Sequence, residues 1–172
     1  MAVLPNFLML WFLFVAVSVL QGAESQSTCP RGWTQRSLSC YLFVTHVAND
    51  WTESEYFCHL LHGKLAEIET MEEDNFLQLE AIRHAHENHG SFGFWIGGTD
   101  ALIEGEWTWV SSGNNFTYSN WAPGFPDDYH GNEDCAHLHK DSHFEWNDER
   151  CDHRMAFICE LALEETPSIV VG

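Results

Sequence analysis

Six cysteines restrict the fold of this 172-residue chain more than any other feature of its sequence. An even number of cysteines indicates a disulfide framework in an exported chain, and six of them allow fifteen pairings. Two pairs are close enough in sequence to close short loops, and a third pair could join the two ends of a domain. Zinc ligation is the alternative, but no Cys-x-x-Cys pair supports it. The candidate pairs are Cys29 with Cys40, Cys135 with Cys151, and Cys58 with Cys159.

The first two dozen residues have the pattern of a secretory signal peptide. The run from Phe7 to Leu20 is apolar except for Ser18, and small residues ending at Ala23 favour cleavage there, although no Lys or Arg precedes the run. An uncleaved signal-anchor helix is the alternative, because the run is almost long enough to span a bilayer. We expect cleavage, and therefore a secreted, extracellular protein without membrane insertion. The expected divisions are a signal peptide (1–23), one domain (24–161) and a C-terminal tail (162–172).

The charge of the chain is strongly negative. It carries 26 acidic and 7 basic residues, a formal net charge of −19 at pH 7. Such a field repels phosphate, so we expect no nucleic acid and no anionic membrane as partner, whereas cations are attracted. A solvated acidic surface accounts for much of the excess. It does not account for the concentration of acidic residues between Asp127 and Asp152.

The apolar pattern predicts two helices followed by many short strands, which is typical of an α+β domain. A capping box at residues 52–55 predicts the start of the first helix, which runs to about His62. On this helix Tyr56 and Leu60 are expected to face the core, with Phe57 as a further candidate.

A second capping box at residues 70–73 starts the second helix, on which Phe76, Leu79 and Ile82 follow at helical spacing. The helix runs into the histidine-rich segment 84–89. Positive histidines suit the C-terminal end of a helix, so we interpret this segment as surface rather than as a metal site.

Short segments of alternating or continuous apolar character predict strands at residues 38–45, 64–68, 94–98, 106–110, 135–139 and 155–160. Asn115 begins the sequon Asn115-Phe116-Thr117, which predicts N-glycosylation. His137 and His139 share one face of the strand 135–139. Zinc is conceivable there because imidazole suits it, but no third ligand is visible in the sequence.

Several short motifs, taken together and in order, resemble the C-type lectin family. The resemblance covers about residues 29–161, and the extra N-terminal cysteine pair is similar to the long form of that domain. It implies the pairs Cys29–Cys40, Cys58–Cys159 and Cys135–Cys151. It also implies an α+β fold of two helices, short antiparallel strands and a long calcium-binding loop region. The motifs are Trp95-Ile-Gly-Gly98, Tyr118-Ser-Asn-Trp121, Pro126-Asp127, Glu133-Asp-Cys135, Trp146-Asn-Asp148 and Phe157-Ile-Cys159.

By resemblance, a sugar-binding Ca²⁺ site falls on Asp127, Glu133, Asn147 and Asp148. These oxygen ligands leave room in a coordination shell of roughly 6–8 for two sugar hydroxyls. The resemblance further implies a cis peptide bond before Pro126.

Phe125 departs from the family pattern, which has Gln or Glu at this position as a ligand of both calcium and sugar. Asp127, rather than Asn, resembles the galactose-type motif. Tyr129 stands where galactose-type members often carry an aromatic ring that stacks on the sugar. The resemblance therefore implies galactose or N-acetylgalactosamine as the favoured ligand. An ordinary loop aromatic is the alternative for Tyr129.

A second, structural Ca²⁺ site of the family falls on positions that all carry an acid in this chain. Such a cluster without a cation would be destabilised by mutual repulsion. The positions are Asp100, Glu104, Asp128, Glu133 and Asp134.

The leading hypothesis is a secreted, Ca²⁺-dependent carbohydrate-binding protein in innate recognition or a related extracellular role. The alternative is the same fold without sugar binding, which would bind protein, mineral or ice. An enzyme is not expected, because no nucleophile–histidine pair or phosphate loop stands out. A homo-oligomer would supply avidity, although no collagen-like or coiled-coil segment is present to build one.

Overall fold

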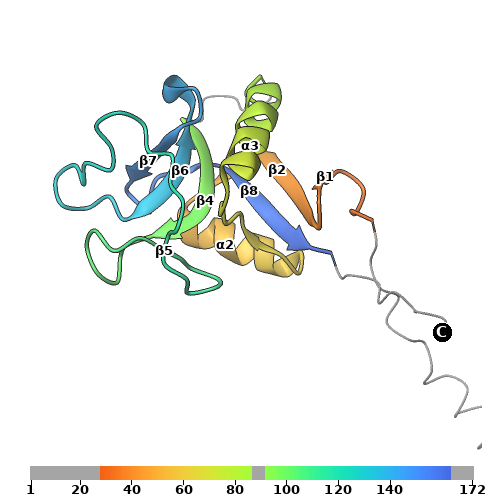
Figure 1. Ribbon diagram of the computed structural model, residues 1–172, viewed down its shortest axis with the longest axis horizontal. Coiled ribbons are helices and arrows are strands. Elements are labelled where there is room, and N and C mark those ends of the chain that lie inside the picture. The colour runs from red at the N-terminus through yellow and green to blue at the C-terminus, as the bar shows by residue number, and fades with distance from the viewer. Residues whose placement is uncertain (1–27, 87–91, 164–172) are drawn as a thin grey trace, which may run out of the picture.

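The computed structural model describes residues 28–86 and 92–163, and Figure 1 shows its helices and strands. A single 3₁₀ turn, η1 (Lys140–Ser142), accompanies them in the described part. The helices are α2 (Trp51–Leu60) and α3 (Met71–His84). The strands are β1 (Thr34–Arg36), β2 (Ser39–Asn49), β3 (Lys64–Leu65), β4 (Gly93–Thr99), β5 (Thr108–Trp109), β6 (Cys135–His139), β7 (Trp146–Glu149) and β8 (Met155–Ala162).

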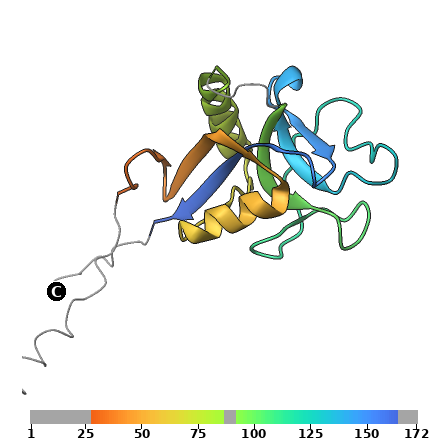
Figure 2. The same ribbon diagram turned by 180° about the vertical axis from the view of Figure 1, so that it is seen from behind.

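The strands form one sheet in the order β1-β2-β8-β4-β6-β7, with β3 added to β8 and β5 added to β4. All pairs are antiparallel except β4 and β8, which run parallel, so the expectation of antiparallel strands holds for all but one pair. Figures 1 and 2 place α2 and α3 on either side of β8. In both views the long loops lie at the end of the domain opposite β1.

One of the two predicted helix starts is confirmed and the other is wrong. Thr70 is the N-cap of α3, where its hydroxyl accepts the amide of Glu73 as predicted. The N-cap of α2 is Asp50, whose carboxylate accepts the amide of Glu53, so the predicted start at Thr52 is wrong. Asp50 competes successfully because a carboxylate is at least as good an N-cap as a hydroxyl and is favoured by the helix dipole.

The predicted inner face of α2 is also wrong. Tyr56 and Leu60 are 65% and 61% exposed, and only Phe57 of the three packs inward, with its ring 5.2 Å from that of Phe157. Cys58 explains the difference, because its bond to a strand of the sheet fixes the helix rotation. On helix α3, too, apolar residues singled out by their spacing are exposed. They are Leu79 and Ile82, whereas the buried apolar residues of this helix are Leu77 and Ala81.

The three predicted disulfides are confirmed. They join Cys29 to Cys40, Cys58 to Cys159 and Cys135 to Cys151. The bond between α2 and β8 closes the longest loop, with a sequence separation of 101 residues. In the loop-entropy account such a closure stabilises the domain by about 4–5 kcal/mol.

The predicted strands all contain extended chain, but their lengths differ. Strand β6 has the predicted bounds, whereas the predicted strand 106–110 is reduced to Thr108–Trp109. Strand β7 was not predicted, because Trp146-Asn-Asp-Glu149 lacks an apolar alternation. At the end of the domain, β8 continues to Ala162, and Leu163 is buried with its amide bonded to Leu38.

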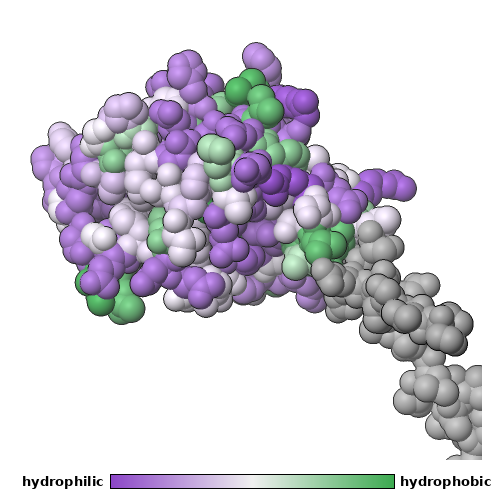
Figure 3. Space-filling model, in the orientation of Figure 1, coloured by the Kyte–Doolittle hydropathy of each residue, from purple (hydrophilic) through white to green (hydrophobic). Residues whose placement is uncertain are grey.

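The surface of the described residues is largely hydrophilic on the face seen in Figure 3. An apolar patch lies over the loop that follows β4, where Leu102 is 90% exposed. Within the described residues no helix is long and apolar enough to cross a membrane.

A buried carboxylate on α3 connects this helix to the sheet and to residues 118–120, which lie before the long acidic loop (residues 122–134) that leads into β6. Asp74 accepts hydrogen bonds from the indole of Trp146 (2.7 Å), the amide of Asn120 (2.7 Å), the hydroxyl of Tyr118 (3.1 Å) and the amide of Gln78 (2.9 Å). Burial raises the pKa of Asp74, while the Trp146, Tyr118 and Asn120 bonds oppose that shift. Four donors from three parts of the chain therefore depend on one side chain.

We predict that Asp74→Ala destabilises the domain by about 3 kcal/mol or more, because it leaves buried donors without an acceptor. The thermal midpoint should fall by about 10 °C. The matched control is Glu72→Ala on the same helix turn, where the side chain is exposed and the change should stay within about 0.5 kcal/mol. Urea unfolding of the oxidised proteins measures both, and equal stability of the two variants would contradict the prediction.

Candidate calcium and ligand site

The long loop, the loop after β4 and strand β7 bring carboxylates into two groups. Each group offers three oxygens that all lie within 4.8 Å of one another. The first group is Asp100, Glu104 and Asp134, and the second group is Asp127, Glu133 and Asp148.

Asp148 shapes the second group. It is fully buried on β7, and its carboxylate accepts the backbone amides of Asp127 (3.0 Å) and Asp128 (2.7 Å). Burial raises the pKa of Asp148, and these backbone bonds oppose the shift. The carboxylate therefore holds the start of the acidic loop against the sheet.

Glu133, in the second group, is bonded to the acidic loop at two points. Its side chain accepts the amide of Tyr129 at 3.1 Å, and its own amide donates to the Asp128 carboxylate at 3.2 Å. Burial raises the pKa of Glu133 to about 7, with the charges of Glu149, Asp148 and Asp127 adding to the effect. Asp128, predicted as a ligand of the structural ion, lies in neither three-carboxylate group.

Asp100 is the buried member of the first group and directly follows β4. It is 3% exposed, and one carboxylate oxygen accepts the amide of Gly105 at 2.9 Å. The other oxygen, Oδ1, is buried without a hydrogen-bond partner. Burial is the main cause that raises the pKa of Asp100, and the charges of Asp134 and Asp148 raise it further.

Asn147 precedes Asp148 on β7 and also has an unpaired oxygen. Its Oδ1 is buried without a partner, while its Nδ2 donates to the Asp148 carbonyl at 2.8 Å and lies 3.1 Å from His137 Nε2. Burial lowers the pKa of His137 to about 3, so this ring is neutral and can accept the amide proton. The contact was not predicted, although pairing β6 with β7 places the two residues opposite each other.

The donor set of both groups fits a divalent cation. Carboxylate and amide oxygens are the ligands that Ca²⁺ takes, and a buried oxygen without a partner is costly unless something binds it. Among the described residues, no ion pair joins a Lys or Arg to any of the six carboxylates. The groups that could hold a metal there contain no histidine, and so offer no support for the zinc alternative at His137 and His139.

Phe125 and Tyr129 precede and follow Asp127 in the chain, and the backbone amide of Tyr129 binds Glu133 of the second group. The peptide bond between Phe125 and Pro126 is cis, as expected. The Phe125 ring is half-buried, with its centroid 6.3 Å from that of His139. Tyr129 is 61% exposed, and its ring lies 4.0 Å from that of His130.

Comparison with known proteins agrees with this fold. The family model for the lectin C-type domain matches residues 47–161. The fold is that of a C-type lectin domain: the C-type lectin carbohydrate-recognition domain of a mouse scavenger receptor superposes with a TM-score of 0.70 at 32% identity, covering 80% of this chain and 100% of that one. The chain belongs to the C-type lectin domain family.

Similar sequences include both short and long proteins. The galactose-specific lectin nattectin of Thalassophryne nattereri is 36% identical over 163 residues, which are 92% of this chain and 98% of nattectin. Perlucin of Haliotis laevigata is 37% identical, covering 77% of this chain and 82% of perlucin. Human C-type lectin domain family 10 member A is 37% identical over 84% of this chain, but this chain spans only 44% of that protein.

We predict that Ca²⁺ raises the thermal midpoint of the protein and that EDTA reverses the effect. A ligand at a hundred times its dissociation constant adds about 2.7 kcal/mol, or roughly 10 °C for a domain of this size. Asp100→Asn and Glu133→Gln should each reduce the shift, because each removes a charged oxygen from one group. Asp141→Asn, an exposed acid outside both groups, is the control. A midpoint that does not respond to Ca²⁺ would refute the prediction.

Proposed function

We propose that the protein is a Ca²⁺-dependent carbohydrate-binding lectin of the galactose type. The observation that carries the proposal is the group of Asp127, Glu133 and Asp148 with the unpaired Asn147 oxygen beside it. These four residues would hold the ion. Bound Ca²⁺ would complete its shell with two hydroxyl oxygens of one sugar, and the carboxylates would accept hydrogen bonds from the same hydroxyls.

The first carboxylate group supports a second ion with a structural role. It lies between the end of β4 and the long loop, where Asp134 contributes its carboxylate and its carbonyl accepts the Thr99 hydroxyl at 2.7 Å. Asp128 and Glu133 complete the ligand set in the proposal. An ion here would offset the repulsion among these acids and so fix the loop that carries the sugar site.

Galactose or N-acetylgalactosamine is the favoured sugar. Asp127 follows Pro126 as in galactose-type members, and nattectin, described as galactose-specific, covers nearly the whole chain. The exposed Tyr129 ring stands at the edge of the second group, where it would stack on the apolar face of the sugar.

A related function without sugar binding is the second candidate. Phe125 favours it, because a phenyl ring offers no oxygen to the ion or to the sugar and packs near His139 instead. A calcium-independent type II antifreeze protein has the same fold, with a TM-score of 0.67 and 27% identity. The partner would then be a protein, a mineral or ice, with the acidic surface organising cations.

Secretion to the extracellular space is part of the proposal. The predicted signal peptide lies outside the described residues, but three disulfides are typical of proteins that fold in an oxidising compartment. Asn115 is exposed, as an N-glycosylation acceptor must be. The proposed domain is residues 24–161 with a tail after it, and an oligomer would supply avidity for multivalent glycans.

We predict that the protein is retained on galactose-agarose in millimolar Ca²⁺ and eluted by EDTA. Glu133→Gln should abolish retention, because it weakens the ion and removes a hydroxyl acceptor. Asp141→Asn should be retained like the parent. Failure of the folded parent to bind a galactose or N-acetylgalactosamine column would overturn the sugar proposal and favour the second candidate.

Phe125→Gln provides a separate test. A glutamine at this position restores an oxygen ligand, so we expect tighter galactose binding by about tenfold, equivalent to one additional net hydrogen bond to the ion or the sugar. Titration calorimetry with galactose in Ca²⁺ measures the change, with Phe92→Gln as a control at an exposed phenylalanine. Unchanged or weaker binding would indicate that Phe125 does not weaken a sugar site.

A further inference from the structure

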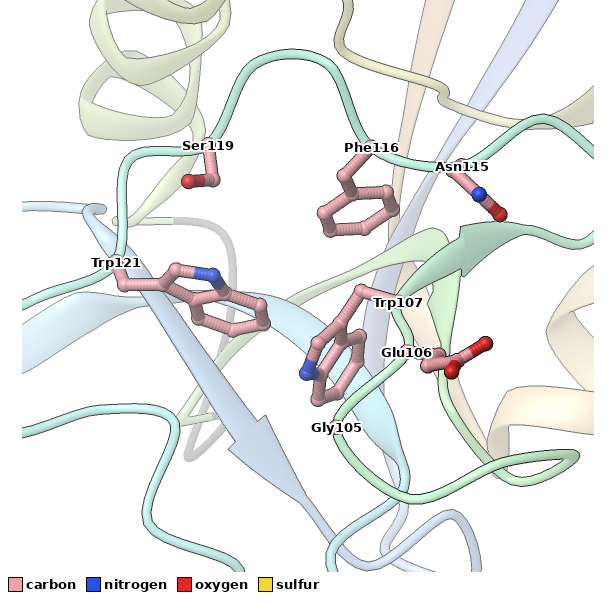
Figure 4. A pocket seen from close by; sticks show the side chains of 7 residues that line it. All are labelled: Gly105, Glu106, Trp107, Asn115, Phe116, Ser119 and Trp121. Atoms are coloured by element: carbon pink, nitrogen blue, oxygen red, sulfur yellow. The ribbon is translucent and has the colours of Figure 1, made fainter.

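An aromatic cleft lies beside the first carboxylate group and plays no part in the calcium sites. Its volume is about 470 Å³, which is in the range that holds a small ligand. It opens between the loop after β4 and the segment that leads into the long loop (Figure 4). Its walls are Trp107, Phe116 and Trp121, and its polar lining is Glu106, Asn115 and Ser119.

The aromatic walls are held in place by contacts with one another and with a buried ring behind them. Trp107 and Trp121 have ring centroids 4.7 Å apart, and Phe116 stacks at 4.0 Å on the buried Trp109. Figure 4 shows the three wall rings turned toward one another. A ligand therefore meets a preformed apolar surface, which lowers the entropic cost of binding.

The polar groups of the cleft suit hydroxyls rather than charge. Glu106 and Ser119 are exposed and offer acceptors at the rim. No Lys or Arg lines the cleft, and the net charge of −19 disfavours an anion.

We propose that this cleft is a Ca²⁺-independent subsite for a neutral pyranose ring of an oligosaccharide. The apolar face of such a ring stacks on an aromatic side chain, and its hydroxyls can bond to the Glu106 carboxylate and the Ser119 hydroxyl at the rim. An apolar peptide would use the rings but not the polar groups at the rim, so the sugar fits better. The subsite is distinct from the calcium sites, although the Gly105 amide that begins the cleft donates to Asp100.

Titration with N,N′-diacetylchitobiose and with lactose, both in EDTA, tests the subsite. The readout is the indole N–H resonances of Trp107 and Trp121 in nitrogen-edited NMR. We expect saturable shifts with at least one sugar at roughly millimolar concentration, the affinity of a single shallow sugar contact. The titration is repeated with Asn115→Gln, because a glycan at Asn115 could itself cover the cleft. Indole resonances that stay unchanged in both proteins would overturn the proposal.

Ser119→Arg should fill the cleft and weaken the binding in EDTA by about tenfold or more. Ser111→Arg, at an exposed serine outside the cleft, should leave it unchanged. Glu106→Gln is the second variant and should weaken binding severalfold without adding bulk, so it decides the question if Ser119→Arg does not fold. Undiminished binding by a folded cleft variant would refute the subsite. Galactose-agarose retention in Ca²⁺ reports separately on the calcium site, so the two proposals can fail independently.

Discussion

The hydrogen bonds to the Asp74 carboxylate support the end of the domain that carries the candidate calcium site and the aromatic cleft. The carboxylate is buried on α3, and its acceptor oxygens take donors from β7 and from the segment before the long loop. The donors lie 44 to 72 residues further along the chain, so a single charged group joins parts of the protein that no local structure connects. A buried carboxylate is tolerated only where such donors compensate for lost hydration.

The buried carboxylates at the acidic loop also accept hydrogen bonds that compensate for lost hydration, but they have fewer donors than Asp74. Asp148 receives two backbone amides, and Glu133 receives one. The carboxylates of Asp127, Glu133 and Asp148 each place an oxygen within 4.8 Å of the others, and burial together with neighbouring charges raises the pKa of Glu133 to about 7. A site that is short of donors and rich in acceptors is suited to a cation rather than to an anion or a hydrogen-bonded core. The contrast with Asp74 separates a structural carboxylate from the candidate ligands.

The sequence predicts features that depend on nearby residues better than features that depend on distant ones. The N-cap at Thr70 is local and was predicted, whereas the inward face of α2 depends on the bond from Cys58 to a cysteine 101 residues away. Strand β7 was missed because the adjacent Asn147 and Asp148 place polar side chains on both of its faces, which leaves no apolar alternation. The family resemblance implies that Asp127 and Asp148 share a site, and the structure brings their carboxylates together. The resemblance did not reveal that backbone amides bind Asp148, or that Asp74 accepts Trp146.

Trp146 links Asp74, the aromatic cleft and the candidate calcium ligands on β7. Its indole donates to Asp74, and its ring centroid lies 5.7 Å from that of Trp121, a wall of the aromatic cleft. Its backbone leads directly into Asn147 and Asp148. Loss of the Asp74 bond would therefore loosen the cleft wall and the candidate β7 ligands together. The candidate calcium site and the aromatic cleft therefore share one support.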